Sequence, residues 1–176
     1  MNAIGLELYC QMLETAVREQ RGEQEQPALT MAINLGLDIR IPPAYIPEEH
    51  QRLRMYKLLG SIRTADEKQT AEQELADRYG PIPEPVQNLL AYAGLKLLAG
   101  PLRISSMERK RDIILLQFQQ DSGADPARLM DYLRRNPSAQ FTPAGVLKLR
   151  ATARPQDSVA QLHAALQQLV AGSGPR

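Results

Sequence analysis

Three prolines within five positions, Pro81, Pro83 and Pro85, separate two stretches that both favour helix. Gly80 precedes them and is typical of the residue that closes a helix with a positive φ angle. Pro81 cannot continue that helix, whereas Pro83 and Pro85 preset φ for the first turn of a new one. The sequence therefore predicts a helix–corner–helix unit whose bend is restricted by the prolines.

The helix before this corner is predicted to begin at Thr64 and to run to Tyr79. Thr64 and Glu67 have the spacing of a capping box, in which each satisfies backbone N–H groups of the first turn. At about 100° per residue, an apolar stripe lies beside a polar stripe formed by Glu67, Thr70, Glu74, Asp77 and Arg78. From composition alone, the polar stripe is either an ordinary exposed face or a docking surface.

Residues 33 to 41 show the clearest strand pattern in the chain, because Ile33, Leu35, Leu37, Ile39 and Ile41 alternate with polar residues or glycine. A period of two over nine positions predicts one strand with a single buried face, ended by Pro42 and Pro43. Residues 46–62 then predict a helix, and its inward side chains are expected to be Leu53, Tyr56 and Leu59.

The last third of the chain predicts strands and helices in separate blocks. Strands are expected at 102–107, 112–119 and 145–152, a short helix at 125–136, and a closing helix that carries Val159, Leu162, Leu166 and Leu169. The absence of strict strand–helix alternation favours an α+β fold, with helices packed on a small mixed or antiparallel sheet.

The composition indicates a globular and cytoplasmic protein. Hydrophobic residues make up 43% and charged residues 23% of the 176 residues, and the net charge of +1 exerts no general attraction on polyanions. The single cysteine, Cys10, excludes an internal disulfide and is interpreted as a packed thiol on an N-terminal helix. No apolar run is long enough to span a bilayer.

Motifs for catalysis are missing from this sequence. It contains no glycine-rich phosphate loop, and Asp66 and Glu67 fit the first turn of a helix better than a magnesium-binding acidic box. His50 and His163 have no cysteine or histidine at metal-ligand spacing. We therefore expect neither catalytic residues nor a metal ion nor a cofactor.

The basic cluster at residues 108–112 leaves two interpretations open. Arg109, Lys110 and Arg111 are flanked by acidic residues and are expected at the turn of a hairpin. The turn is either simply solvated or contacts phosphate, although no aromatic side chain accompanies it to stack on bases. A small nucleic-acid-binding module that uses this turn is thus the alternative function.

Three segments in order resemble the C-terminal region of the transcription-repair coupling factors. They are IGLELYCQMLETAV, DIRIPPAYIPEEHQRLRMYKLL and ELADRYGPIPEPVQNLL, which together cover roughly residues 4 to 100. The resemblance implies that residues 1–22 are the last helix of a translocase motor, 23–32 a polar linker, 33–171 the C-terminal regulatory domain and 172–176 a tail.

The resemblance also implies a role without catalysis. In this family an ATP-driven translocase on double-stranded DNA displaces stalled RNA polymerase and recruits UvrA through a UvrB-like module. The C-terminal domain is expected to fold back on that module, to mask its UvrA-binding surface and to restrain the motor. By the family pattern, the contact maps onto Glu74, Asp77 and Arg78.

Overall fold

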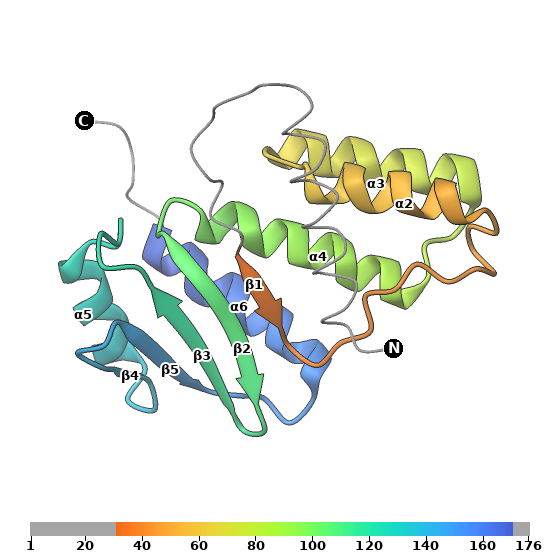
Figure 1. Cartoon of the computed structure of the whole chain (residues 1–176). Coiled ribbons are helices and arrows are strands. Elements are labelled where there is room, and N and C mark those ends of the chain that lie inside the picture. The colour runs from red at the N-terminus through yellow and green to blue at the C-terminus, as the bar shows by residue number, and fades with distance from the viewer. Residues whose placement is uncertain (1–30, 171–176) are drawn as a thin grey trace. The chain divides into compact units, whose positions relative to one another are not determined.

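The computed structural model describes residues 31–170, which contain five helices and five strands (Figure 1). In chain order these are β1 (Ala32–Asn34), α2 (Glu49–Gly60), α3 (Ala65–Tyr79), α4 (Glu84–Ala99), β2 (Ile104–Lys110), β3 (Ile113–Phe118), α5 (Pro126–Arg135), β4 (Gln140–Phe141), β5 (Val146–Arg150) and α6 (Pro155–Val170). The predicted α+β class is confirmed. Cys10, the N-terminal helix predicted in 1–22, most of the linker 23–32 and the tail 172–176 lie outside the described residues.

The chain divides into two compact units, one made of residues 38–90 and the other of residues 31–37 together with 91–170 in the described range. The first unit holds α2, α3 and the beginning of α4. The second holds the whole sheet, the rest of α4, α5 and α6. The division falls inside α4, between Leu90 and Ala91.

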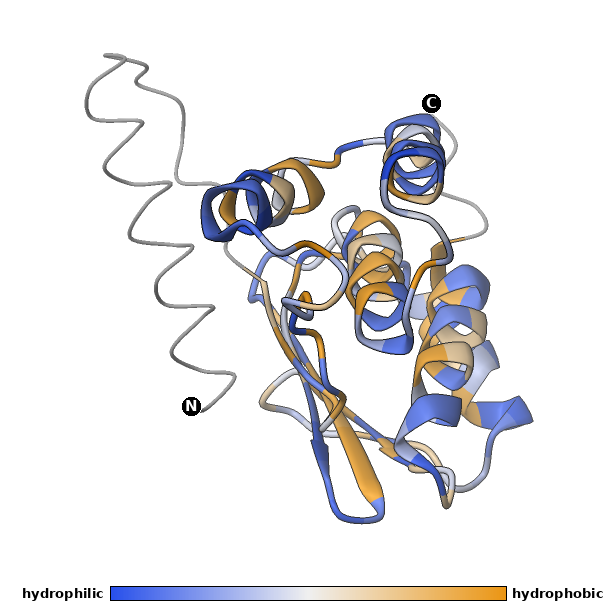
Figure 2. Cartoon of the chain, turned by 90° about the vertical axis from the view of Figure 1, so that its right-hand side faces the viewer, coloured by the Kyte–Doolittle hydropathy of each residue, from blue (hydrophilic) through white to orange (hydrophobic). Residues whose placement is uncertain are grey.

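In the first unit, the predicted signals that begin and end α3 are confirmed. The Thr64 hydroxyl accepts a hydrogen bond from the Glu67 N–H at 3.1 Å. The Glu67 carboxylate in turn accepts one from the Arg63 N–H, at 2.6 Å. Ala71 and Leu75 are buried on the inner side of the helix, and Gly80 follows its last turn. Figure 2 shows hydrophilic and hydrophobic residues on different sides of the helices.

The strand predicted for residues 33–41 is much shorter in the structure. Only β1, Ala32–Asn34, pairs with β2, and Gly36 then bends the chain with a φ angle of 75°. The predicted alternation of burial nevertheless continues: Ile33, Leu35 and Ile41 are buried and Leu37 and Ile39 are half-buried, whereas the polar residues and the glycine between them are exposed. The pattern therefore predicted correctly which side chains turn inward but not how long the strand is.

The second unit is built on a five-stranded sheet of order β1-β2-β3-β5-β4. β1 runs parallel to β2 and the other neighbours are antiparallel, so the sheet is mixed. One row of paired residues crosses four strands and is buried in all of them: Ile33, Met107, Leu116 and Leu147. α6 covers this face, and its own buried residues are Ser158, Leu162, Ala165, Leu166 and Leu169.

The hairpin between β2 and β3 turns later than the sequence predicted. Glu108, Arg109 and Lys110 belong to β2, and Lys110 pairs with Ile113, so the connection consists only of Arg111 and Asp112. The sequence predicts a turn at 108–111, because a run of charges is typical of turns. Pairing with the apolar strand β3 extends β2 through that charged run.

Candidate docking surface

One side of α3 forms a continuous polar surface, called here the α3 face and made of Thr70, Gln73, Glu74, Asp77 and Arg78. These residues line a shallow depression of about 460 Å³, and all of them are exposed. The three residues selected from the sequence, Glu74, Asp77 and Arg78, are thus brought together on one surface. Gln73 also belongs to it and was not predicted.

The α3 face carries two carboxylates against one guanidinium. Arg78 Nη1 lies 3.3 Å from Glu74 Oε1, one helical turn away. The Arg78 guanidinium also lies 5.9 Å from the centre of the Tyr79 ring, within the range of a cation–π contact. Among the described residues, no hydrogen bond or ion pair engages the Asp77 side chain. Asp77 is therefore available for a basic group of a partner.

Tyr45 holds the corner that follows this face. Its hydroxyl donates toward the Leu75 carbonyl at 3.0 Å and the Gly80 carbonyl at 3.2 Å, and its ring centre is 5.7 Å from that of Tyr79. Burial raises the pKa of Tyr45, and the nearby Tyr79 adds a smaller contribution in the same direction. A tyrosine hydroxyl is protonated at neutral pH even without this shift, so it can donate. The end of α3 is therefore fixed from a loop some 30 residues earlier in the chain.

Gly80 adopts a backbone conformation that other residues rarely reach. Its φ and ψ angles are 83° and −158°, and its N–H donates to the Ala76 carbonyl at 3.0 Å. This combination belongs to a region that is essentially restricted to glycine. The predicted positive φ angle is confirmed, although ψ differs from that of a left-handed helix cap.

We expect Gly80→Ala to lower the free energy of unfolding by about 1–3 kcal/mol. A Cβ atom there would meet no heavy atom within 4 Å, so the loss would come from backbone strain alone. Gly100→Ala is the matched control, because Gly100 has no positive φ angle and its Cβ would lie at an ordinary 3.5 Å from the Lys96 carbonyl. Urea unfolding of both variants measures the difference. Equal midpoints would contradict the strain at Gly80.

In the basic cluster at residues 108–112, on which the nucleic-acid-binding alternative depends, Arg109 makes hydrogen bonds within the fold. Arg109 donates hydrogen bonds to the Thr152 carbonyl at 2.8 Å, the Arg154 carbonyl at 3.2 Å and the Ser158 hydroxyl. Lys110 is exposed and lies 3.2 Å from Glu108. Arg109 therefore ties β2 to the start of α6, and its guanidinium is already engaged.

Other kinds of site find no support in residues 31–170. No group of three histidine, cysteine or acidic side chains lies close enough together there to hold a metal ion. Within the same range, no helix combines the length and the apolar character that crossing a membrane requires. The α3 face therefore remains the main candidate in the first unit.

Comparison with known proteins assigns the family. The model of the TRCF domain matches residues 35–129, more than half of the chain. The chain belongs to the TRCF domain family. This confirms the resemblance noted in the sequence, and the α3 face lies within the matched range.

Relatives of this TRCF domain are much longer proteins. The transcription-repair-coupling factor of Bacillus subtilis is 30% identical over 126 residues, which cover 71% of this chain and 11% of the relative. That of Escherichia coli is 31% identical over 143 residues, covering 78% of this chain and 12% of the relative. The chain thus spans about an eighth or less of the length of these two relatives.

A solved structure supports the fold of the TRCF domain. The crystal structure of the C-terminal domain of a transcription-repair coupling factor matches with a TM-score of 0.70 and 18% identity. The match covers 82% of this chain and 96% of the other. The mixed sheet and its helices are therefore those of a TRCF C-terminal domain.

Proposed function

We propose that this TRCF domain is a regulatory domain that docks its α3 face on the UvrB-like module of a transcription-repair coupling factor in the cytoplasm. Docking would mask the UvrA-binding surface of that module and restrain the DNA translocase of the same protein until RNA polymerase is engaged. The domain itself would bind no ATP and catalyse no reaction. The observation that carries the proposal is the exposed α3 face, with an unengaged Asp77, at a rigid corner.

The charges of the α3 face suit a contact that opens and closes. Exposed charge pairs contribute about 0.2–1 kcal/mol each, and partly desolvated pairs contribute more. A few pairs between Glu74, Asp77 and a basic partner surface would therefore hold the domain closed without making release slow. The Tyr45 contacts and the Gly80 corner would hold the backbone at the end of α3 in place, so docking would cost mainly the freedom of the side chains themselves.

Charge reversal on the α3 face tests this proposal. In a transcription-repair coupling factor that carries this domain, we expect Glu74→Lys with Asp77→Lys to tighten UvrA binding and to raise basal ATP turnover, each by about tenfold, which corresponds to about 1.4 kcal/mol of lost docking energy. The isolated domain should melt as before, because both side chains are exposed. UvrA affinity and ATP turnover are the two measurements.

Glu72→Lys provides a matched control for Glu74→Lys. Glu72 is exposed on the same helix and pairs with Lys68 at 3.7 Å, as Glu74 pairs with Arg78, but it lies about 160° around the helix. It should leave UvrA affinity and ATP turnover unchanged. An equal effect of Glu72→Lys and Glu74→Lys, or no effect of the double variant, would remove the α3 face from the mechanism.

A further inference from the structure

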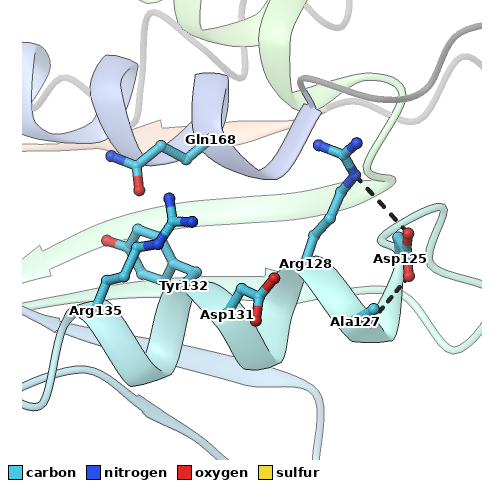
Figure 3. A pocket seen from close by; sticks show the side chains of 7 residues that line it. All are labelled: Asp125, Ala127, Arg128, Asp131, Tyr132, Arg135 and Gln168. Atoms are coloured by element: carbon cyan, nitrogen blue, oxygen red, sulfur yellow. Dashed lines mark hydrogen bonds and ion pairs between the residues drawn. The ribbon is translucent and has the colours of Figure 1, made fainter.

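A second depression, of about 300 Å³, lies in the other unit between α5 and α6 (Figure 3). Arg128, Tyr132 and Arg135 occupy positions i, i+4 and i+7 of α5 and therefore point to one side of that helix. Gln168 of α6 faces them. Tyr132 is only 7% exposed, so its ring anchors this side of α5 in the core of the unit.

Three hydrogen-bond donors converge at one end of this pocket. Figure 3 shows the Arg135 guanidinium, the Tyr132 hydroxyl and the Gln168 amide gathered there. Within residues 31–170, none of these three side chains has a hydrogen-bond or ion-pair partner. The Tyr132 hydroxyl is protonated at neutral pH and can donate, and burial raises its pKa further. The pocket thus offers donors that no group of the fold uses.

The acidic residues that line the pocket are already engaged. The Asp125 carboxylate caps α5 by accepting from the Ala127 N–H at 2.9 Å and pairs with Arg128 at 3.8 Å. Asp131 lies 3.5 Å from Arg134. The unpaired charge in the pocket is therefore the positive charge of Arg135.

These groups together favour one small oxyanion over a polyanion. A carboxylate accepts two parallel hydrogen bonds from a guanidinium and has further lone pairs for a hydroxyl and an amide. A nucleic-acid backbone would bring additional phosphates beside Asp125 and Asp131, which would repel them. A cationic residue at the C-terminal end of a helix is also favoured by the helix dipole, which by itself would explain the presence of Arg135. The dipole does not explain why the Tyr132 hydroxyl and the Gln168 amide lie beside it.

We propose that this pocket binds a single carboxylate, supplied by an aspartate or glutamate side chain of a polypeptide partner. Arg135 forms the ion pair, and Tyr132 and Gln168 donate the additional hydrogen bonds. The pocket lies in a different unit from the α3 face, so this interaction does not depend on the proposed regulatory function.

The test is an NMR titration of the complete ¹⁵N-labelled chain with acetyl-Gly-Glu-Gly-amide. The matched peptide acetyl-Gly-Gln-Gly-amide lacks only the charge, and inorganic phosphate is the third ligand. We expect the glutamate peptide to shift the resonances of Arg135, Tyr132 and Gln168 and to bind at least about tenfold more tightly than the glutamine peptide. Phosphate should bind more weakly than the glutamate peptide.

Single substitutions test which side chains bind the glutamate peptide. Arg135→Gln should weaken binding of the glutamate peptide at least about tenfold, and Tyr132→Phe, which removes only the hydroxyl, about threefold. Arg150→Gln removes the same charge from an exposed residue at the end of β5, outside the pocket lining, and should have no effect. Equal binding of the two peptides, equal losses for Arg135→Gln and Arg150→Gln, or tighter binding of phosphate than of the glutamate peptide would overturn the proposal.

Discussion

Leu75→Ala is expected to lower the free energy of unfolding of the first unit by about 2–5 kcal/mol, the usual range when a buried leucine leaves a cavity. Leu75 is fully buried on the inner side of α3, and its carbonyl accepts the hydrogen bond from Tyr45. The substitution therefore leaves a void directly below the α3 face. Urea unfolding followed by circular dichroism measures the loss.

Glu72→Ala is the control for this substitution. It lies on the same helix and removes an exposed side chain, so its effect should stay within about 0.5 kcal/mol. A loss below about 1 kcal/mol for Leu75→Ala, close to that of the control, would contradict the loss of about 2–5 kcal/mol expected for a buried leucine. The burial assigned to α3 would then be wrong.

Arg109→Met is expected to destabilise the second unit by about 3 kcal/mol, because it leaves acceptors at the start of α6 without their donor. Two of these acceptors are the Thr152 and Arg154 carbonyls, and the third is the Ser158 hydroxyl, whose residue is fully buried. Methionine keeps most of the length of the arginine side chain. The loss of stability should therefore come mainly from the missing hydrogen bonds. Thermal and urea unfolding measure it.

Lys110→Met separates this structural role from a role in binding nucleic acid. Lys110 follows Arg109 in β2, but its side chain is exposed and, within residues 31–170, pairs only with Glu108. Its replacement should change stability by less than about 0.5 kcal/mol. Equal stability of the two variants, together with a loss of DNA binding in both, would instead favour the nucleic-acid alternative.

The parts of the fold that depend on neighbouring residues could be predicted from the sequence. α3 begins at its Thr64 cap and ends before Gly80 because these signals act within one helical turn. The helical repeat also placed Glu74, Asp77 and Arg78 on one surface. Whether that surface docks on a partner stays a prediction, since exposure alone does not distinguish a docking surface from a solvated one.

The parts that depend on distant pairing could not be predicted. The alternation in residues 33–41 reports which side chains are buried, whereas the length of β1 depends on how far β2 runs beside it. The charged run 108–110 is a strand because β3 supplies hydrogen bonds to it. Tyr45 reaches the end of α3 across some 30 residues, and no local pattern signals such a contact.

The position of β1 has a consequence for the order in which the chain can fold during its synthesis. Ala32 pairs with Ser106, and the described part of the first unit, residues 38–90, lies between these two partners in the sequence. A ribosome therefore releases β1 before residues 38–90, and all of these before β2 emerges. During that interval β1 lacks the strand with which it pairs, whereas residues 38–90 have all been synthesised. For the same reason, no single cleavage of the chain separates the two units intact, because a cut anywhere in 38–90 leaves β1 on one fragment and the other four strands on the other.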